Sequence, residues 1–270
     1  MTSLTSPNSP LPQATPIASV SALRSLRVLS YNIHKGFNPN NTRFILSEIR
    51  QAIRSVDAEL VFLQEVLGNH ENHGRKHGNW IPGAQFEFLA DEIWPHYAYG
   101  KNAIYQHGHH GNAILCKLPF SYWENTDVSR FKISQRGILH GVVVNRLHVF
   151  CMHLGLLGFE RRGQVNTLID TIEKKVPADA PLIIAGDFND WQLTLDRKLR
   201  SALGVKEAFR ELRGRPARTY PAAMPMLQLD RVYYRGLEIK DANRLAGDHW
   251  QNLSDHCPLY AEFELPLPAR

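Results

Sequence analysis

Residues 181–190 read PLIIAGDFND, and this stretch decides how the rest of the chain is interpreted. The letters LIIA form a short apolar run of the kind found in buried strands. Gly186 follows that run, and Asp187 and Asn189 come next, one residue apart. In an extended segment their side chains point the same way. A carboxylate and a carboxamide there can hold a hard cation, a phosphate oxygen or an attacking water, although Gly, Asp and Asn are also ordinary turn residues.

The composition fits one large globular domain. The chain has 270 residues, of which 43% are hydrophobic, enough to form a substantial core. Residues 1–24 are rich in Ser, Thr and Pro, and Arg24 is their only charge. We therefore expect a disordered N-terminal tail over 1–24 and a single domain over 25–270. The tail lacks the basic start and apolar stretch of a signal peptide, and no run approaches the roughly 18 apolar residues of a spanning helix.

The cysteines and the net charge indicate the cellular compartment and the kind of substrate. Cys116, Cys151 and Cys257 lie in apolar runs, and their spacing matches no zinc motif. We expect buried free thiols in a reducing compartment, and hence a cytoplasmic protein. A net charge of +5 is compatible with an anionic substrate. There is no basic stripe with interleaved aromatic residues of the kind that follows a nucleic-acid backbone, and no sign of an obligate protein partner.

Periodicity predicts a chain of strands with a few helices between them. Strands are expected over 26–33, 59–66, 96–101, 111–117, 121–129, 137–144, 147–154, 182–185, 229–234 and 258–265, with a further one within 236–247. Helices are expected over 42–56, 86–93 and 159–176. Asn40 and Asn41 offer a cap for the first helix, and Asn145 with Arg146 a tight hairpin. Residues 67–83 should form a polar loop, and 191–228 an irregular segment.

Nine polar residues share one property, because each lies at or beside the edge of an apolar strand. One such residue means little, since every strand end meets water somewhere. Nine of them, all carboxylates, carboxamides or imidazoles, indicate the floor of a single site. In stacked-sheet architectures, strand ends and their loops converge on a rim where function collects. The nine are Asn32, Glu65, Asn112, His153, Asp187, Asn189, Asp230, Asp255 and His256.

The motifs that carry these residues resemble those of a known superfamily. In chain order they read YNIHKG, LQEV, GNAIL, MHLG, GDFND, LDRV and SDH. This series resembles the endonuclease/exonuclease/phosphatase superfamily over about residues 26–264, and most of all its small uncharacterised bacterial members. GDFN and the terminal SDH are specific when both follow an upstream LQE. The resemblance implies an α/β fold: a four-layer α/β/β/α sandwich, two mixed β-sheets packed face to face with helices outside.

The resemblance also implies metal-dependent cleavage of a phosphate ester, and we expect the ester to be a diester. The implied cofactor is Mg²⁺, with Mn²⁺ as an alternative. By matching position, Glu65 would be the main ligand of the ion, helped by Asn32 and Asp255. Asp187 would orient or deprotonate the attacking water, and Asn189 would hold that water or a phosphate oxygen.

The remaining implied roles concern the phosphate itself. His256 would contact the scissile phosphate, with Asp230 fixing its tautomer, while Asn112 and His153 would bind the other phosphate oxygens. The residue types agree with this chemistry. Mg²⁺ prefers oxygen ligands and keeps several waters. It neutralises charge in the transition state, and an imidazole needs a partner to set which nitrogen carries the proton.

Several alternatives stay open from the sequence. The chain could bind a phosphate without cleaving it, or act on a monoester. The substrate could be nucleic acid or a phospholipid head group. Arg213, Arg215 and Arg218, near Tyr220, could grip a second phosphate or an anionic head group, or belong to a solvated loop. His34 stands where repair nucleases tend to carry an acidic residue. A zinc site could use the loop histidines His70, His73, His77, His107, His109 and His110.

Overall fold

The structure, a computed structural model, describes residues 25–70, 80–105, 108–131 and 134–265. The predicted tail over 1–24 lies outside these residues. Twelve strands alternate with six α-helices and one short 3₁₀ turn in the described residues. In order they are β1 (Ser25–Asn32), η2 (His34–Gly36), α1 (Leu46–Val56), β2 (Leu60–His70), α2 (Gln85–Ala90), β3 (His96–Tyr105), β4 (Gly108–Cys116), β5 (Phe120–Asp127), β6 (Gly137–Val143), β7 (Leu147–His153), α3 (Gly158–Lys175), β8 (Leu182–Asp187), α4 (Asp196–Leu203), β9 (Lys206–Glu207), α5 (Ala208–Arg213), β10 (Asp230–Arg235), β11 (Glu238–Arg244), α6 (Asp248–Gln251) and β12 (Leu259–Glu264).

The strands form two six-stranded mixed sheets. One has the order β11-β12-β1-β2-β4-β3, and the other β5-β6-β7-β8-β10-β9. The pairs β1-β2 and β7-β8 are parallel, and the other pairs are antiparallel. Two sheets placed face to face need helices on their outer faces to cover the remaining apolar surface.

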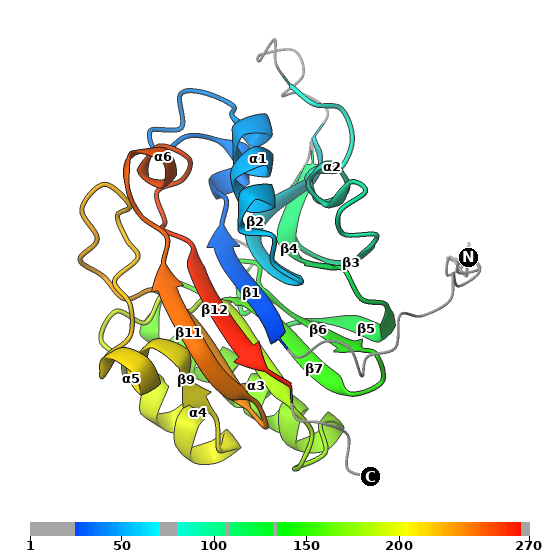
Figure 1. The fold of residues 1–270 in the computed structure, drawn as a ribbon, viewed down its shortest axis with the longest axis vertical. Coiled ribbons are helices and arrows are strands. Elements are labelled where there is room, and N and C mark those ends of the chain that lie inside the picture. Colours follow the sequence, from blue (N-terminus) through cyan, green and yellow to red (C-terminus); the bar gives the residue numbers. More distant parts are fainter. Residues whose placement is uncertain (1–24, 71–79, 106–107, 132–133, 266–270) are drawn as a thin grey trace.

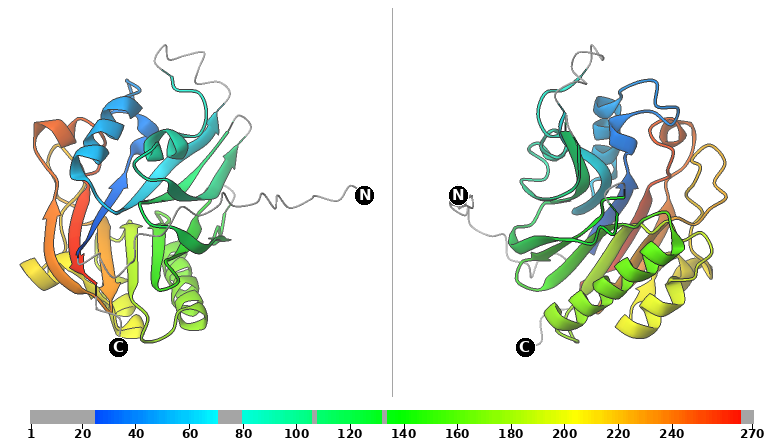
Figure 2. Two further views of the ribbon diagram at one scale, coloured as in Figure 1. Left: turned by 45° about the vertical axis from the view of Figure 1, so that its right-hand side comes forward. Right: turned by 180° about the vertical axis from the view of Figure 1, so that it is seen from behind.

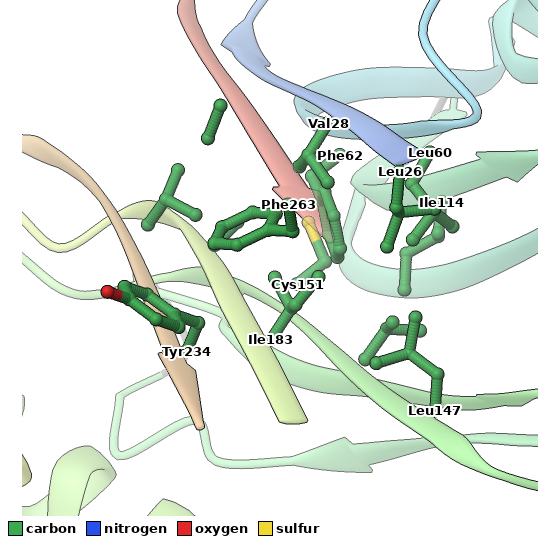
Figure 3. Packing of buried hydrophobic residues seen from close by; sticks show 14 of the residues in the cluster. Leu26, Val28, Leu60, Phe62, Ile114, Leu147, Cys151, Ile183, Tyr234 and Phe263 are labelled. Carbon is green, nitrogen blue, oxygen red and sulfur yellow. The ribbon is translucent and has the colours of Figure 1, made fainter. Parts of the chain in front are cut away.

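The layers follow from three buried clusters of apolar side chains. Val28, Phe62, Cys151, Ile183 and Phe263 belong to the cluster between the two sheets, which Figure 3 shows from close by. A second cluster joins the first sheet to α1 and α2, and a third joins the second sheet to α3 and α4. Figure 2 shows these helices on the outer faces of the molecule. The predicted four-layer α/β/β/α sandwich is therefore confirmed.

The LIIA run forms a central strand that is buried on both faces. Ile183 and Ala185 point into the cluster between the sheets, whereas Leu182 and Ile184 point toward α3 and α4. A strand covered on both sides has no polar face, which explains why this run does not alternate in polarity. No helix of the described residues is long and apolar enough to cross a membrane.

The first helix begins later than predicted. α1 starts at Leu46, and its N-cap residue, Ile45, makes no side-chain capping bond, so the predicted cap by Asn40 and Asn41 is wrong. The preceding residues form a turn around Asn38, whose Oδ1 accepts from the backbone N of Thr42 at 2.8 Å. That turn uses the polar residues that would otherwise have extended the helix.

Two predicted loops contain regular structure. β2 continues to His70 inside the range 67–83, while residues 71–79 lie outside the described part. The range 191–228 holds α4, β9 and α5, so the prediction of an irregular segment is wrong there. Leu195, Leu199 and Leu203 recur at four-residue spacing and pack into the third cluster. The sequence prediction missed this short apolar helical face because prolines follow later in the same range.

The topology brings the predicted polar residues to one end of the sandwich. Asn32, His153 and Asp187 are the last residues of β1, β7 and β8. β10 is antiparallel to β8, so its first residue, Asp230, pairs with Asp187. In Figure 1 this end lies toward α6, where the arrow of β1 points.

Candidate active site

Asp187 and Asp230 bring two carboxylates together on neighbouring strands. The His256 imidazole contacts both: its Nδ1 is 2.8 Å from Asp230 Oδ2, and its Nε2 is 3.8 Å from Asp187 Oδ2. All three side chains are buried, and one ligand atom from each lies within 4.8 Å of the others. We refer to Asp187, Asp230 and His256 as the acid–base cluster.

The imidazole of this cluster is charged at neutral pH. Burial lowers the pKa of His256, but Asp230 and Asp187 outweigh burial and raise its pKa to about 10. Asp230 therefore does more than select a tautomer, because it stabilises an imidazolium with a proton on each nitrogen. The Tyr220 ring lies against His256, with ring centroids 5.0 Å apart.

Asp187 contacts polar groups from three other positions. Its Oδ1 accepts a hydrogen bond from the backbone N of Asn189 at 3.0 Å, and its Oδ2 accepts one from Asn32 Nδ2 at 3.3 Å. His153 Nε2 lies 3.5 Å from the same Oδ2. Burial raises the pKa of Asp187 to about 6, although His256 acts in the opposite direction. A carboxylate whose pKa lies near working pH suits a general base.

The GDFND turn supports this carboxylate through its backbone. Gly186 has a φ of +144°, and a Cβ there would lie 1.9 Å from the carbonyl oxygen of Met152, so only glycine fits. Asn189 adopts a left-handed φ of 50°, which asparagine tolerates better than most residues. Its Nδ2 donates to the carbonyl oxygen of Leu154 at 2.9 Å. The turn is thereby fixed on both sides of Asp187.

The SDH segment is tied to the end of β1. The Ser254 hydroxyl donates to the carbonyl oxygen of Asn32 at 2.7 Å and accepts from the backbone N of His256 at 3.2 Å. Asp255 Oδ1 lies 3.6 Å from Nδ1 of His34, which follows the same strand. The Ser254 hydroxyl thus holds the segment that carries His256 against the end of β1.

Glu65 stands at an irregular position of β2. Its φ is 56°, and the register with β4 shifts between Leu63 and Val66. A β-bulge of this kind redirects a side chain that a regular strand would place elsewhere. Glu65 Oε2 lies 2.9 Å from Lys35 Nζ. Burial raises the pKa of Glu65, but the positive charge of the nearby Lys35 prevails and holds its pKa far below the usual range.

Glu65 and the acid–base cluster share one side of the molecule. The buried His153 feels the charges of both Glu65 and His256, and its contact with Asp187 places it beside the cluster. Burial, followed by the charge of Arg136, holds the pKa of His153 well below its usual value, so this imidazole is neutral. The predicted residues from distant segments are therefore gathered in one region.

Asn112 links the two sheets beneath this region. Its Nδ2 lies 3.2 Å from the carbonyl oxygen of Gly137 and 3.4 Å from that of Cys151. Its Oδ1 is buried and has no hydrogen-bond partner among the described residues. In this orientation Asn112 offers an acceptor to a ligand.

The Glu65 carboxylate has the chemistry of a ligand for a hard divalent cation. The Glu65 carboxylate is ionised and now pairs with Lys35 Nζ at 2.9 Å, and a bound cation would take over that pairing. The Glu65 and Asp255 side chains keep 20% and 28% of their surface exposed, which leaves room for an ion with bound waters. Asn32 adds a neutral carboxamide. The acid–base cluster fits an ion less well, because its imidazolium already neutralises the carboxylates.

Several residues of this region were not assigned a role from the sequence. His34 and Lys35 both have positive φ, at 45° and 58°, and this strained turn aims them at Asp255 and Glu65. Their place two and three residues after Asn32 was a usable signal in the sequence. Arg136 donates from Nε to the carbonyl oxygen of Leu154 at 3.2 Å, and no strand-end pattern indicates it.

The zinc alternative finds no support in the described residues. There, the acid–base cluster is the one group of three or more His, Cys, Asp or Glu side chains close enough to share an ion. His109 lies in β4, with its Nδ1 2.9 Å from the Tyr99 hydroxyl, and His110 is its neighbour. The side chains of the other predicted members, His70, His73, His77 and His107, lie outside the described part.

Comparison with known proteins gives one family. A sequence model of the Endonuclease/Exonuclease/phosphatase family matches residues 29–256. An uncharacterised protein, YbhP of Escherichia coli K12, is 44% identical over 246 residues, which cover 89% of this chain and 97% of that protein. A UPF0294 protein of Vibrio vulnificus is 28% identical over 263 residues, covering 92% and 80%.

Solved structures share the fold at low identity. An endonuclease/exonuclease/phosphatase from Beutenbergia cavernae has a TM-score of 0.71 and 20% identity, covering 90% of this chain and 72% of that one. D. rerio TDP2 in complex with a single-strand DNA product has a TM-score of 0.62 and 18% identity, covering 89% and 99%. At such identities the likeness concerns the fold alone.

Proposed function

Because the chain belongs to the endonuclease/exonuclease/phosphatase family, we propose that it is a divalent-metal-dependent phosphoesterase that hydrolyses a phosphodiester. The observation that carries the proposal is the acid–base cluster, in which a charged imidazole and a carboxylate with a pKa of about 6 lie side by side. Hydrolysis of an anionic ester needs a base for the attacking water and positive charge near the phosphate.

The proposed roles follow from the protonation states. Asp187 is mostly ionised above about pH 6, so it accepts the proton of the attacking water. His256 directs its Nε2–H toward a phosphate oxygen and stabilises the negative charge that builds up there, while Asp230 keeps it charged. General acid or base catalysis of this kind contributes about 10²–10⁴-fold.

The other residues bind and orient in this proposal. Glu65, Asn32 and Asp255 hold the divalent ion, Mg²⁺ or Mn²⁺, which supplies charge neutralisation at the phosphate when bound. Asn189 and Asn112 position the water and the substrate. His153 is neutral, so it donates a hydrogen bond without competing with Asp187 for the proton.

Exposed side chains beside the site bear on the substrate class. The rim beside Asn189 carries exposed apolar side chains: Leu156 is 63% exposed, Leu157 50% and Trp191 43%. Such a rim suits a diester with an apolar or aromatic group next to the phosphate, as in a phospholipid or a nucleic-acid base. The three buried free cysteines support work in a reducing compartment such as the cytoplasm.

Two alternative functions remain: a scaffold that binds phosphate without cleaving it, and a phosphomonoesterase. The Asp187 carboxylate, with a pKa of about 6, favours an enzyme over a scaffold, because a scaffold that only binds phosphate needs no general base. Calorimetric titration of Mg²⁺ against wild type and Glu65→Ala separates scaffold from enzyme, because a scaffold need not lose ion binding in the variant.

The proposal is tested by a substrate panel. Release from a generic aryl phosphodiester, an aryl phosphomonoester, DNA, RNA and phospholipid vesicles is measured with Mg²⁺ and with chelator. The panel is run on wild type, Asp187→Asn and, as a control away from the site, His96→Ala at the far end of β3. We expect metal-dependent diester cleavage that Asp187→Asn lowers at least about 100-fold and His96→Ala leaves unchanged. Equal activity in wild type and Asp187→Asn would refute the proposal.

A further inference from the structure

A cavity of about 280 Å³ opens between α5, β11 and the segment after α5. Figure 1 shows α5 beside β11 at the edge of the first sheet. Four arginines line it, together with Asn243 and Phe209: Arg213, Arg215, Arg218 and Arg244. No residue of the acid–base cluster lines this cavity.

The charge of this arginine cavity is poorly balanced. Within the described residues, Asp241 is the one carboxylate that pairs with any of the four guanidinium groups, at 3.7 Å from Arg213. The guanidinium groups of Arg215, Arg218 and Arg244 have no carboxylate within ion-pair distance in the same part of the chain. All four arginines are exposed at the mouth of this cavity, and an anion placed among them would offset the repulsion between their like charges.

Part of the cavity is held in place before any ligand arrives. Arg244 Nη1 donates to the carbonyl oxygen of Arg218 at 2.9 Å, which fixes the backbone of the opposite wall. Arg213 Nη2 donates to Asn243 Oδ1 at 3.3 Å. The side chains of Arg215 and Arg218 make no such bond among the described residues and remain available to a ligand.

The wall of the cavity continues directly into the candidate active site. Thr219, next to Arg218, accepts a hydrogen bond at its carbonyl oxygen from the backbone N of Cys257 at 2.8 Å. Tyr220 follows and lies against His256. The charge of Arg244 is also felt at Cys257, where it opposes the rise of the thiol pKa that burial causes.

We propose that the arginine cavity is a second anion site that binds a phosphate group, separate from the acid–base cluster. Guanidinium groups match the planar, multidentate geometry of phosphate oxygens better than any other side chain. The cavity is smaller than the roughly 300–1,000 Å³ of sites for drug-sized molecules, so it suits a small anionic group. Its ligand is inorganic phosphate or the terminal phosphomonoester of a larger molecule. The site does not depend on the proposed catalytic activity.

The experiment is a calorimetric titration with inorganic phosphate at low ionic strength in the presence of chelator. It compares wild type, Arg215→Gln/Arg218→Gln, and His256→Ala, which alters the other candidate phosphate site. Arg162→Gln/Arg197→Gln removes the same charge from exposed positions of α3 and α4. We expect the first double variant to lose at least about tenfold in affinity, and Arg162→Gln/Arg197→Gln to bind as wild type does. His256→Ala should keep the binding step that the first double variant loses, so that a loss in this variant is confined to a second, separate step.

Each other outcome overturns the proposal. Loss of binding in His256→Ala alone would place the phosphate in the acid–base cluster, and equal loss in both double variants would reduce the effect to net charge. Absence of phosphate binding by wild type would also refute the site. Repeating the titration with glycerol phosphate separates the two sources: equal or tighter binding indicates a phosphomonoester, and weaker binding indicates the free ion.

Discussion

Replacement of Asp230 by Asn tests the charged state of His256, on which the proposed chemistry depends. The 2.8 Å contact between Asp230 Oδ2 and His256 Nδ1 is the main favourable cause of the raised pKa of the imidazole. The variant keeps the size of the side chain and a hydrogen-bonding group, but removes its charge. We expect the pKa of His256 to fall from about 10 toward its ordinary value or below, because burial is then less well opposed.

The magnitude follows from the linkage between protonation and folding. A group whose pKa is raised by folding stabilises the folded state fully below its unfolded pKa, about 6.5, and loses that contribution as pH rises to its folded pKa. Each pH unit below the folded pKa of about 10 is equivalent to about 1.4 kcal/mol. Asp230→Asn should therefore lower the free energy of unfolding by up to about 3 kcal/mol near pH 7.5, and by less than about 1 kcal/mol near pH 9.5.

The assay is urea unfolding followed by circular dichroism between about pH 6 and 10, in metal-free buffer, with histidine proton resonances followed in parallel. Asp170→Asn, on the exposed face of α3, is the matched control and should show no pH-dependent change. A stability difference that stays constant across this range, or a wild-type His256 that titrates near about pH 6.5, would refute the assigned charge.

Further predictions concern the ion and the turn. Glu65→Gln should weaken Mg²⁺ binding at least about tenfold by calorimetry, because it removes the charged ligand, while the exposed Glu48→Gln binds as wild type does; equal affinity in all three proteins would remove Glu65 from the ion site. Gly186→Ala should lower the free energy of unfolding by more than about 3 kcal/mol, because its Cβ would meet the Met152 carbonyl. Gly204→Ala, also at positive φ but in open space, should cost about 1 kcal/mol, and similar losses in both variants would contradict the close approach.

Much of the fold was predictable because its signals are local. The LIIA run and the alternating patterns predicted strands, the family resemblance implied their division into two sheets, and polar residues at strand ends indicated where chemistry would collect. Asp187 and Asp230 were predicted from strand-end position alone, and their antiparallel pairing explains why both reach one site. Arg231, next to Asp230, points to the opposite face and pairs with Asp190 at 3.5 Å, as strand alternation predicts.

The rest depends on long-range geometry that a linear pattern does not carry. The bulge that aims Glu65 arises from its register with β4, which lies far along the chain. The charge of His256 results from the carboxylates of Asp230 on β10 and Asp187 on β8. Arg136 reaches the site from a loop, through a bond to Leu154. α4 was missed although its leucines recur every four residues, because we gave more weight to the prolines that follow it.

The most direct measurement of the central claim follows the oxygen that enters the product. Wild type and His256→Ala are incubated with an aryl phosphodiester and Mg²⁺ in water labelled with heavy oxygen, and the products are examined by mass spectrometry. If a water held at Asp187 attacks, the label enters the phosphate in wild type. The rate of label entry should fall at least about 100-fold in His256→Ala, and no label should enter in the presence of chelator. Release without metal, release unchanged in the variant, or label in the alcohol instead of the phosphate would contradict the account.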